Sequence, residues 1–230
     1  MAYNRQDILD THKDYQENVN NWEYYIRSFN GGYDYMIGQY LNRYNLELDN
    51  EFNQRLANTP CDNHCKNIVQ IYSSFLFRTK ASRNFGNMAE EPTLERFLKD
   101  ADLEGNNFNT VIKSAQNYAS IYGHCFMILD KPKIQTNTRA EELDQDIRPY
   151  LSIVTPENCL DWNFKRQANG KYVLDYLKIR EEVDRKGGTY IRVWYQDRVD
   201  TLYVEDQKTD PVIIDTADNL IGKIPAVILY

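Results

Sequence analysis

Residues 111–132 read VIKSAQNYASIYGHCFMILDKP, and the spacing of their apolar residues changes at Gly123. Before that glycine, apolar residues recur every three or four positions, which is typical of one face of a helix. After it, an unbroken apolar run extends from Cys125 to Leu129 and is stopped by Asp130-Lys131-Pro132. Such a run between turn residues is typical of a buried strand. We therefore predict a helix that ends at Gly123 and a strand that follows it.

The chain before this point has helical periodicity. Apolar residues lie on one helical face over 15–29 and stop at Gly31-Gly32, and a second helical pattern covers 33–44. The polar stretch 45–58 has two further apolar residues at helical spacing. Thr59-Pro60 is a typical helix start, and the wide apolar stripe that follows it predicts a buried helix. Shorter helices are predicted over 94–103 and 111–122.

The chain after Gly123 has the patterns of strands and turns. Residues 133–147 are polar and predict a loop. Strands are predicted over 150–154, 172–183, 190–195, 199–204 and 224–230, with a hairpin turn at 186–188. The predicted fold class is therefore α+β, with N-terminal helices followed by an antiparallel β-rich layer.

These patterns divide the chain into three parts. We expect an N-terminal helical arm over 1–58, the helical part of a domain over 59–122, and the antiparallel β-rich part of the same domain over 123–230. The chain ends on an apolar strand pattern without a polar tail. We therefore expect the domain to be cut short at Tyr230.

Composition restricts the class of protein. The 230 residues include 27 Lys+Arg and 34 Asp+Glu, and a formal net charge of −7 disfavours binding to nucleic acid through the overall charge. No segment has the roughly 20 apolar residues of a membrane span, and no signal peptide is recognisable. Four cysteines are too sparse for a disulfide framework, so we expect free thiols and synthesis as a soluble intracellular protein. The 18 tyrosines suit wet-edged cores and protein interfaces.

Two motifs resemble metal sites. Cys61, His64 and Cys65, together with His124-Cys125, offer nitrogen and sulfur ligands for zinc. The two helical cysteines also continue the apolar stripe, however, and buried inert thiols are the favoured interpretation. The stretch 100–105 imitates the start of a calcium loop, but Val111 stands where the glutamate ligand is required, and an ordinary turn is favoured. We predict no metal, no cofactor and no enzymatic activity.

A compact basic cluster follows the predicted buried helix. It consists of Arg78, Lys80 and Arg83. Such side chains contact phosphate groups, but they also bind the free carbonyls at the end of a helix. Helix capping is the favoured interpretation, and phosphate contact is the alternative.

Several short phrases of the chain, in the same order, resemble the N-terminal wing part of tailed-bacteriophage portal proteins, the head–tail connectors. They are FNQRL at 52–56 with Thr59 and Asn63, FLFR at 75–78, YG at 122–123, LDKP at 129–132, RPYL at 148–151, TPEN at 155–158, DW at 161–162, LKIREE at 177–182, VWY at 193–195 and GKIP at 222–225. Residues 1–51 match less clearly.

The resemblance implies a portal-wing-like fold and a structural role without hydrolytic activity. The family forms rings, usually dodecamers, at the portal vertex of the virion, after assembly in the host cytoplasm. Double-stranded DNA is packaged and ejected through the ring, which associates with terminase, the major capsid protein and head–tail adaptor proteins, and with no membrane. Channel-lining segments lie beyond Tyr230, so no DNA-contacting residue is carried over.

Within that hypothesis, aromatic residues on the first two predicted helices are the candidate subunit interface, because amphipathic helices outside the main core need a partner surface. They are Tyr15, Trp22, Tyr25, Tyr33, Tyr40 and Tyr44. Packing of these helices on their own domain is the alternative. Two other functions stay open: a small intracellular zinc-dependent enzyme that uses the Cys/His pairs, and another capsid or adaptor structural protein.

Overall fold

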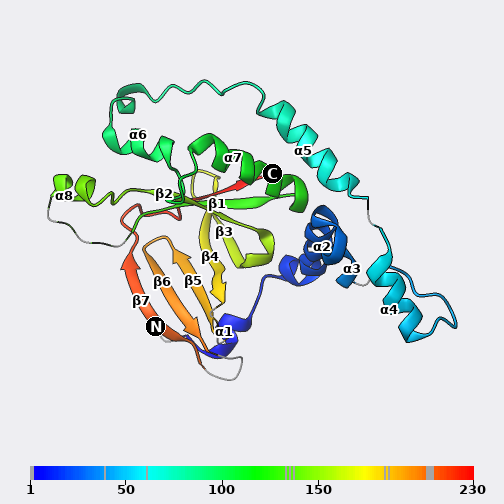
Figure 1. Cartoon of the computed structure of the whole chain (residues 1–230). Helices are drawn as coiled ribbons and strands as arrows, with labels where there is room; N and C mark the ends of the chain where they lie inside the picture. The colour runs from blue at the N-terminus through cyan, green and yellow to red at the C-terminus, as the bar shows by residue number, and fades with distance from the viewer. Residues whose placement is uncertain are drawn as a thin grey trace.

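The computed structural model describes residues 3–38, 40–60, 62–132, 134, 136, 138–183, 185, 187–205 and 210–230. Within these ranges, helices dominate the first half and two antiparallel sheets the second (Figure 1). The α+β prediction is confirmed.

The helices follow the predicted pattern with some differences. They are α1 (Arg5–Leu9), α2 (Lys13–Asn30), α3 (Gly32–Ile37), α4 (Asp49–Asn58), α5 (His64–Leu76), α6 (Pro92–Lys99), α7 (Phe108–Tyr122) and α8 (Arg139–Asp144), with short 3-10 turns η1 (Gly86–Met88) and η2 (Pro156–Asn158). None of the helices in the described ranges is long and apolar enough to cross a membrane. Gly123 adopts a left-handed φ of 88° and donates its N–H to the Ala119 carbonyl, which ends α7 as predicted.

Three helical predictions were wrong in detail. The helix expected over 33–44 stops at Ile37, and α8 lies inside the stretch expected to be a loop, where the Thr138 hydroxyl accepts the Glu141 N–H at 3.2 Å. Thr59 does not begin α5. It ends α4 instead, because its N–H donates to the Arg55 carbonyl at 2.9 Å, and α5 is capped by Asn63, whose side chain accepts the Lys66 N–H.

The strands form two antiparallel sheets in the described chain. The smaller sheet has the order β2 (Tyr150–Val154), β1 (Cys125–Asp130), β8 (Ala226–Leu229). The larger is a meander of β3 (Cys159–Arg166), β4 (Tyr172–Val183), β5 (Thr189–Tyr195), β6 (Arg198–Val204) and β7 (Val212–Asp218). The predicted meander is confirmed. Sequence patterns missed β3 and β7, whose pairings contain register shifts that break simple alternation.

The sheets and helices stack in layers, and β1 shows why. Phe126 and Ile128 point into a core shared with Leu177, Ile179 and Trp194 of the larger sheet. The alternate residue Cys125 packs against Ala115 and Ala119 of α7. Successive strand residues face opposite sides of a sheet, so β1 is covered by α7 on one face and by the larger sheet on the other.

The far face of the larger sheet is covered by α1. Ile8 packs there with Leu160, Ile191, Val193 and Leu202. The predicted arm 1–58 thus begins with a segment that packs on the sheet, whereas the division of the chain at 58 and 122 stays a prediction.

A buried lysine anchors α1. The Lys178 side chain on β4 is fully buried, and its ammonium donates to the carbonyls of Asp7 and Asp10 at the end of α1. Burial lowers the pKa of Lys178, and the nearby Asp161 carboxylate opposes that shift. A buried cation requires such partners, and the carbonyl end of a helix provides them.

Replacement of Lys178 by methionine tests this anchor. Lys178→Met keeps the aliphatic stem and removes the donor to both carbonyls. We expect the free energy of unfolding to fall by about 1–3 kcal/mol, and amide exchange to accelerate most over residues 3–12. Urea unfolding and hydrogen exchange measure both effects. The exposed Lys171→Met is the matched control, and unchanged exchange over α1 in Lys178→Met would contradict the anchor.

The buried carboxylate of Asp200 binds Tyr3, near the start of the chain. The Tyr3 hydroxyl donates to Asp200 Oδ2 at 2.6 Å, and the Thr216 hydroxyl donates to Oδ1 at 2.9 Å. Burial alone would raise the pKa of Asp200. Hydrogen bonds from Tyr3, Arg198 and Thr216 outweigh this effect, so the pKa lies below its ordinary value of 3.8. A depressed carboxylate pKa contributes stability that is present above the unfolded value and lost as the pH falls through the folded value.

The substitution Tyr3→Phe should therefore lower the free energy of unfolding by an amount that depends on pH. At about pH 7 we expect the free energy of unfolding to fall by about 1.5–3 kcal/mol, since one hydrogen bond to a charged group is lost. The difference from the wild type should shrink on acidification below the usual aspartate range, as Asp200 becomes protonated. Urea unfolding across this range measures it. A difference that grows on acidification would refute the assigned role of the contact.

Candidate functional site

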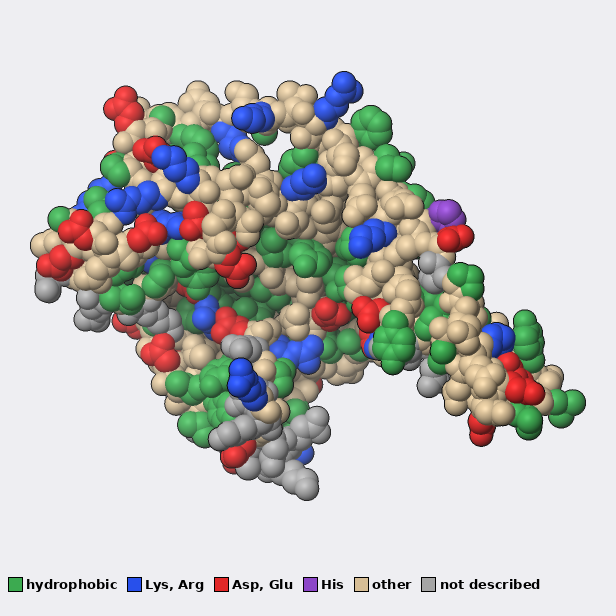
Figure 2. Space-filling model, in the orientation of Figure 1, with side chains coloured by type: hydrophobic (Ala, Val, Ile, Leu, Met, Phe, Trp, Pro, Cys, Tyr) green, Lys and Arg blue, Asp and Glu red, His purple; other side chains and the backbone are tan. Residues whose placement is uncertain are grey.

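Helix α5 has a wide apolar face that the rest of the described chain leaves uncovered. Its members recur at helical spacing and are between 54% and 69% exposed; they are Ile68, Ile71, Tyr72, Phe75 and Leu76. Figure 2 shows hydrophobic side chains along the outer side of α5. A shallow hollow of about 510 Å³ runs beside this face, between Asn67 and Arg78. The prediction that α5 is a buried helix was wrong.

Only a narrow strip of α5 contacts the domain. Ser73 is buried and Val69 and Phe77 are half-buried on the side of α5 that contacts α7 and α2. The helix start is held at the end of α2, where the Asn63 side chain donates to the Phe29 carbonyl at 2.5 Å. Periodicity identified the apolar stripe correctly, but the small polar Ser73, not the apolar residues, lies on the inner side. Helix α5 therefore presents an apolar surface from a fixed position.

Two of the predicted interface residues belong to the protein's own packing. Trp22 is 6% exposed, and its ring lies edge-on to His124 at 5.8 Å. The Tyr15 hydroxyl donates to the Glu157 carbonyl at 3.1 Å, and its ring contacts Trp22 at 5.9 Å. These contacts attach α2 to its own domain, and the role of Tyr15 and Trp22 in a subunit interface stays a prediction.

The other four predicted interface residues are more accessible. Tyr25, Tyr33 and Tyr44 are exposed, and Tyr44 lies under the Arg55 guanidinium at 4.4 Å. Tyr40 is half-buried and contacts Tyr24 at 4.7 Å. Their role in a subunit interface stays a prediction.

The basic cluster lies in the extended connection between α5 and α6. Arg78, Lys80 and Arg83 are all exposed, and Figure 2 shows Lys and Arg side chains along this connection. Arg83 does not cap α5: its guanidinium donates to Asn109 Oδ1 at 2.7 Å and lies 4.8 Å from the Phe108 ring, at the start of α7. Contact of the cluster with phosphate stays a prediction.

The proposed zinc ligands occupy different environments. Cys65 is exposed on α5, whereas Cys125 is buried against α7, where burial raises the pKa of its thiol to about 11. Burial lowers the pKa of His124, whose ring packs against Trp22. Among the described residues, no three His, Cys, Asp or Glu side chains are grouped as metal ligands. Cys61 lies outside those residues.

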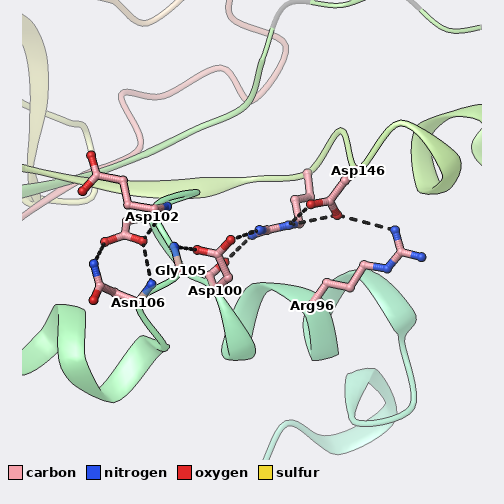
Figure 3. A network of polar contacts seen from close by, with 8 residues as sticks. Arg96, Asp100, Asp102, Gly105, Asn106 and Asp146 are labelled. Atoms are coloured by element: carbon pink, nitrogen blue, oxygen red, sulfur yellow. Dashed lines mark hydrogen bonds and ion pairs between the residues drawn. The ribbon is translucent and has the colours of Figure 1, made fainter.

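The stretch that imitates a calcium loop binds its own backbone instead (Figure 3). Asp102 Oδ1 accepts the N–H groups of Glu104 and Asn106 at 3.0 and 3.2 Å, and Asp100 Oδ1 accepts the Gly105 N–H at 3.0 Å. Burial alone would raise the pKa of Asp102. The hydrogen bonds from the Asn106 side chain and from the backbone N–H groups of Glu104 and Asn106 outweigh this effect and lower the pKa. The carboxylates therefore stabilise the α6–α7 turn, as the favoured interpretation predicted.

Arg148 joins this turn to the smaller sheet. It is 4% exposed, and its guanidinium lies 2.6 Å from Asp100 Oδ2 and 3.1 Å from Asp146 Oδ1. The Leu151 N–H on β2 donates to the Ala101 carbonyl at 2.7 Å. Sequence analysis did not identify Arg148 as a structural residue, because its partner Asp100 lies 48 residues away in the chain.

Comparison with known proteins gives one finding on the family. A family model described as phage portal protein, SPP1 Gp6-like, matches residues 6–230. The match includes every element from α2 to β8, with α5 and the turn held by Arg148 among them. A search of curated proteins gave no match to the chain.

The contribution of the buried Arg148 to stability can be compared with that of the exposed ion pair between Arg96 and Asp146. Arg148→Met leaves Asp100 without its buried cation, so we expect the free energy of unfolding to fall by about 2 kcal/mol. Arg96→Met is the matched control, because Arg96 also pairs with Asp146 but both side chains are exposed, and it should cost about 0.5 kcal/mol. Urea unfolding measures both variants. Equal losses would contradict the role given to Arg148.

Proposed function

This chain belongs to the SPP1 Gp6-like family of phage portal proteins, and on that premise we propose that it is a subunit of the ring at a phage portal vertex. Family membership supports a structural role in the virion. The finer proposal is that copies of the chain assemble around a channel through which double-stranded DNA is packaged and later ejected. A dodecamer is the proposed number of subunits.

The observation that carries this proposal is the uncovered apolar face of α5. Soluble monomers rarely expose a contiguous apolar surface of this kind, and such a surface marks a contact with another protein. Membership of a portal protein family favours further copies of the same chain as that partner.

The charge of the chain supports passage of DNA rather than its retention. A formal net charge of −7 gives little attraction for phosphate over the molecule as a whole. DNA that slides through a ring should not be held tightly at each step. We propose that terminase, the major capsid protein and head–tail adaptor proteins attach to the same ring, and that the ring assembles in the host cytoplasm before it is built into the virion.

Native mass spectrometry and negative-stain imaging test the assembly. We expect rings with a central channel and a mass close to twelve times 27.2 kDa. Assembly should depend on concentration, because each contact adds a separate association step. A chain that stays monomeric at every accessible concentration would contradict the ring.

A further inference from the structure

We propose that α5 of one subunit docks side-on against strand β7 of the next copy of the chain. This inference rests on the proposed ring and names the two surfaces that meet in it. The α5 surface consists of Ile68, Ile71, Tyr72, Phe75 and Leu76 with the basic residues beside it. The β7 surface consists of Val212, Ile213 and Ile214 with Asp215 and Asp218.

Strand β7 is the second uncovered apolar element. It pairs only with β6 among the described strands, and Val212, Ile213 and Ile214 are all exposed. A register shift at a β-bulge interrupts the pairing with β6, since Asp215 pairs with Thr201 and Ile213 with Leu202, which leaves Ile214 without a partner residue on β6. Because successive side chains of a strand point to opposite faces, Val212 and Ile213 place exposed apolar side chains on both faces of β7.

The same bulge selects the kind of partner. A flat edge strand invites another strand to extend the sheet, whereas a bulge disturbs the row of backbone groups that such pairing needs. Side-chain packing does not need that row. A helix with an apolar face is therefore the better match for β7 than a second strand.

Charge complementarity identifies the α5 surface as that helix. Every charged Lys, Arg, Asp or Glu side chain in residues 64–85 is basic: Lys66, Arg78, Lys80 and Arg83. Every Lys, Arg, Asp or Glu side chain in residues 210–218 is acidic: Asp210, Asp215 and Asp218. Two apolar surfaces with opposite flanking charges attract each other, while two copies of either surface repel.

The placement of the two surfaces suits a ring. Helix α5 and strand β7 lie on opposite sides of the molecule in Figure 1. A contact between two different surfaces of identical subunits is heterologous, so each subunit offers one surface to the subunit before it and the other to the subunit after it. Repetition of such a contact closes into a ring when the rotation between neighbours allows it.

Photo-crosslinking tests the contact directly. Phe75→p-benzoylphenylalanine in the full chain, mixed with ¹⁵N-labelled chain, should crosslink to peptides from 212–218 of the other isotope. Tyr172→p-benzoylphenylalanine is the matched control: Tyr172 is 67% exposed against 69% for Phe75, and it lies at the β3–β4 turn, on the side of the sheet away from β7. Crosslinks from position 75 to another surface would overturn the inference.

Charge exchange gives an independent readout. Arg78→Asp and Asp218→Arg should each raise the concentration of half-assembly about tenfold, and their combination should restore assembly towards the wild-type value. Circular dichroism of each variant checks that the fold is intact. Loss in both single variants without any rescue in the pair would argue against direct contact.

The outcomes separate the inference from the proposed function. Wild-type rings whose position-75 crosslinks avoid β7 overturn the α5–β7 contact and leave the ring standing. Intermolecular α5–β7 crosslinks in open oligomers support the contact and contradict ring closure. Monomers without intermolecular crosslinks overturn both.

Discussion

The alternation of side chains along β1 is the constraint on which the layered structure depends. Residues at 126 and 128 enter the core between the two sheets, while Cys125 faces α7. A shift of one residue would exchange these two sets and place the large aromatic ring of Phe126 against the small alanines of α7. The packing of α7, of both sheets and of α1 beyond them therefore depends on the register of one short strand.

Three buried charged residues attach segments of the chain to the two sheets. Lys178 and Asp200 hold the N-terminal segment on the larger sheet, and Arg148 ties the α6–α7 turn to the smaller one. Each of the three is itself buried, and each contacts a segment far away in the chain. Such groups add directionality that apolar contacts lack, because an unpaired buried charge is far more costly than a displaced methyl group.

Local rules were sufficient for much of the fold. The helix stop at Gly123, the strand that follows it and the β4–β6 meander are encoded by periodicity and turn residues within short windows. The same rules failed where the result depends on distant partners. Periodicity located the stripe on α5 but not the side on which other elements would lie, and Thr59 resembled a start signal although its hydroxyl bonds backward to Arg55. Bulges concealed β3 and β7, and the contact of Trp22 with His124 could not be predicted because the two residues lie far apart in the chain.

The pairing of β8 with β1 has a consequence for the order of folding. Cys125 lies opposite Leu229, so the smaller sheet joins segments separated by most of the second half of the chain. Contacts of such long sequence separation form late, because the intervening chain must first be ordered. During synthesis on the ribosome, one edge of β1 remains open while the five-stranded meander, whose strands are neighbours in sequence, can already form. The meander is thus expected to act as the early folding unit, and the smaller sheet to close on it last.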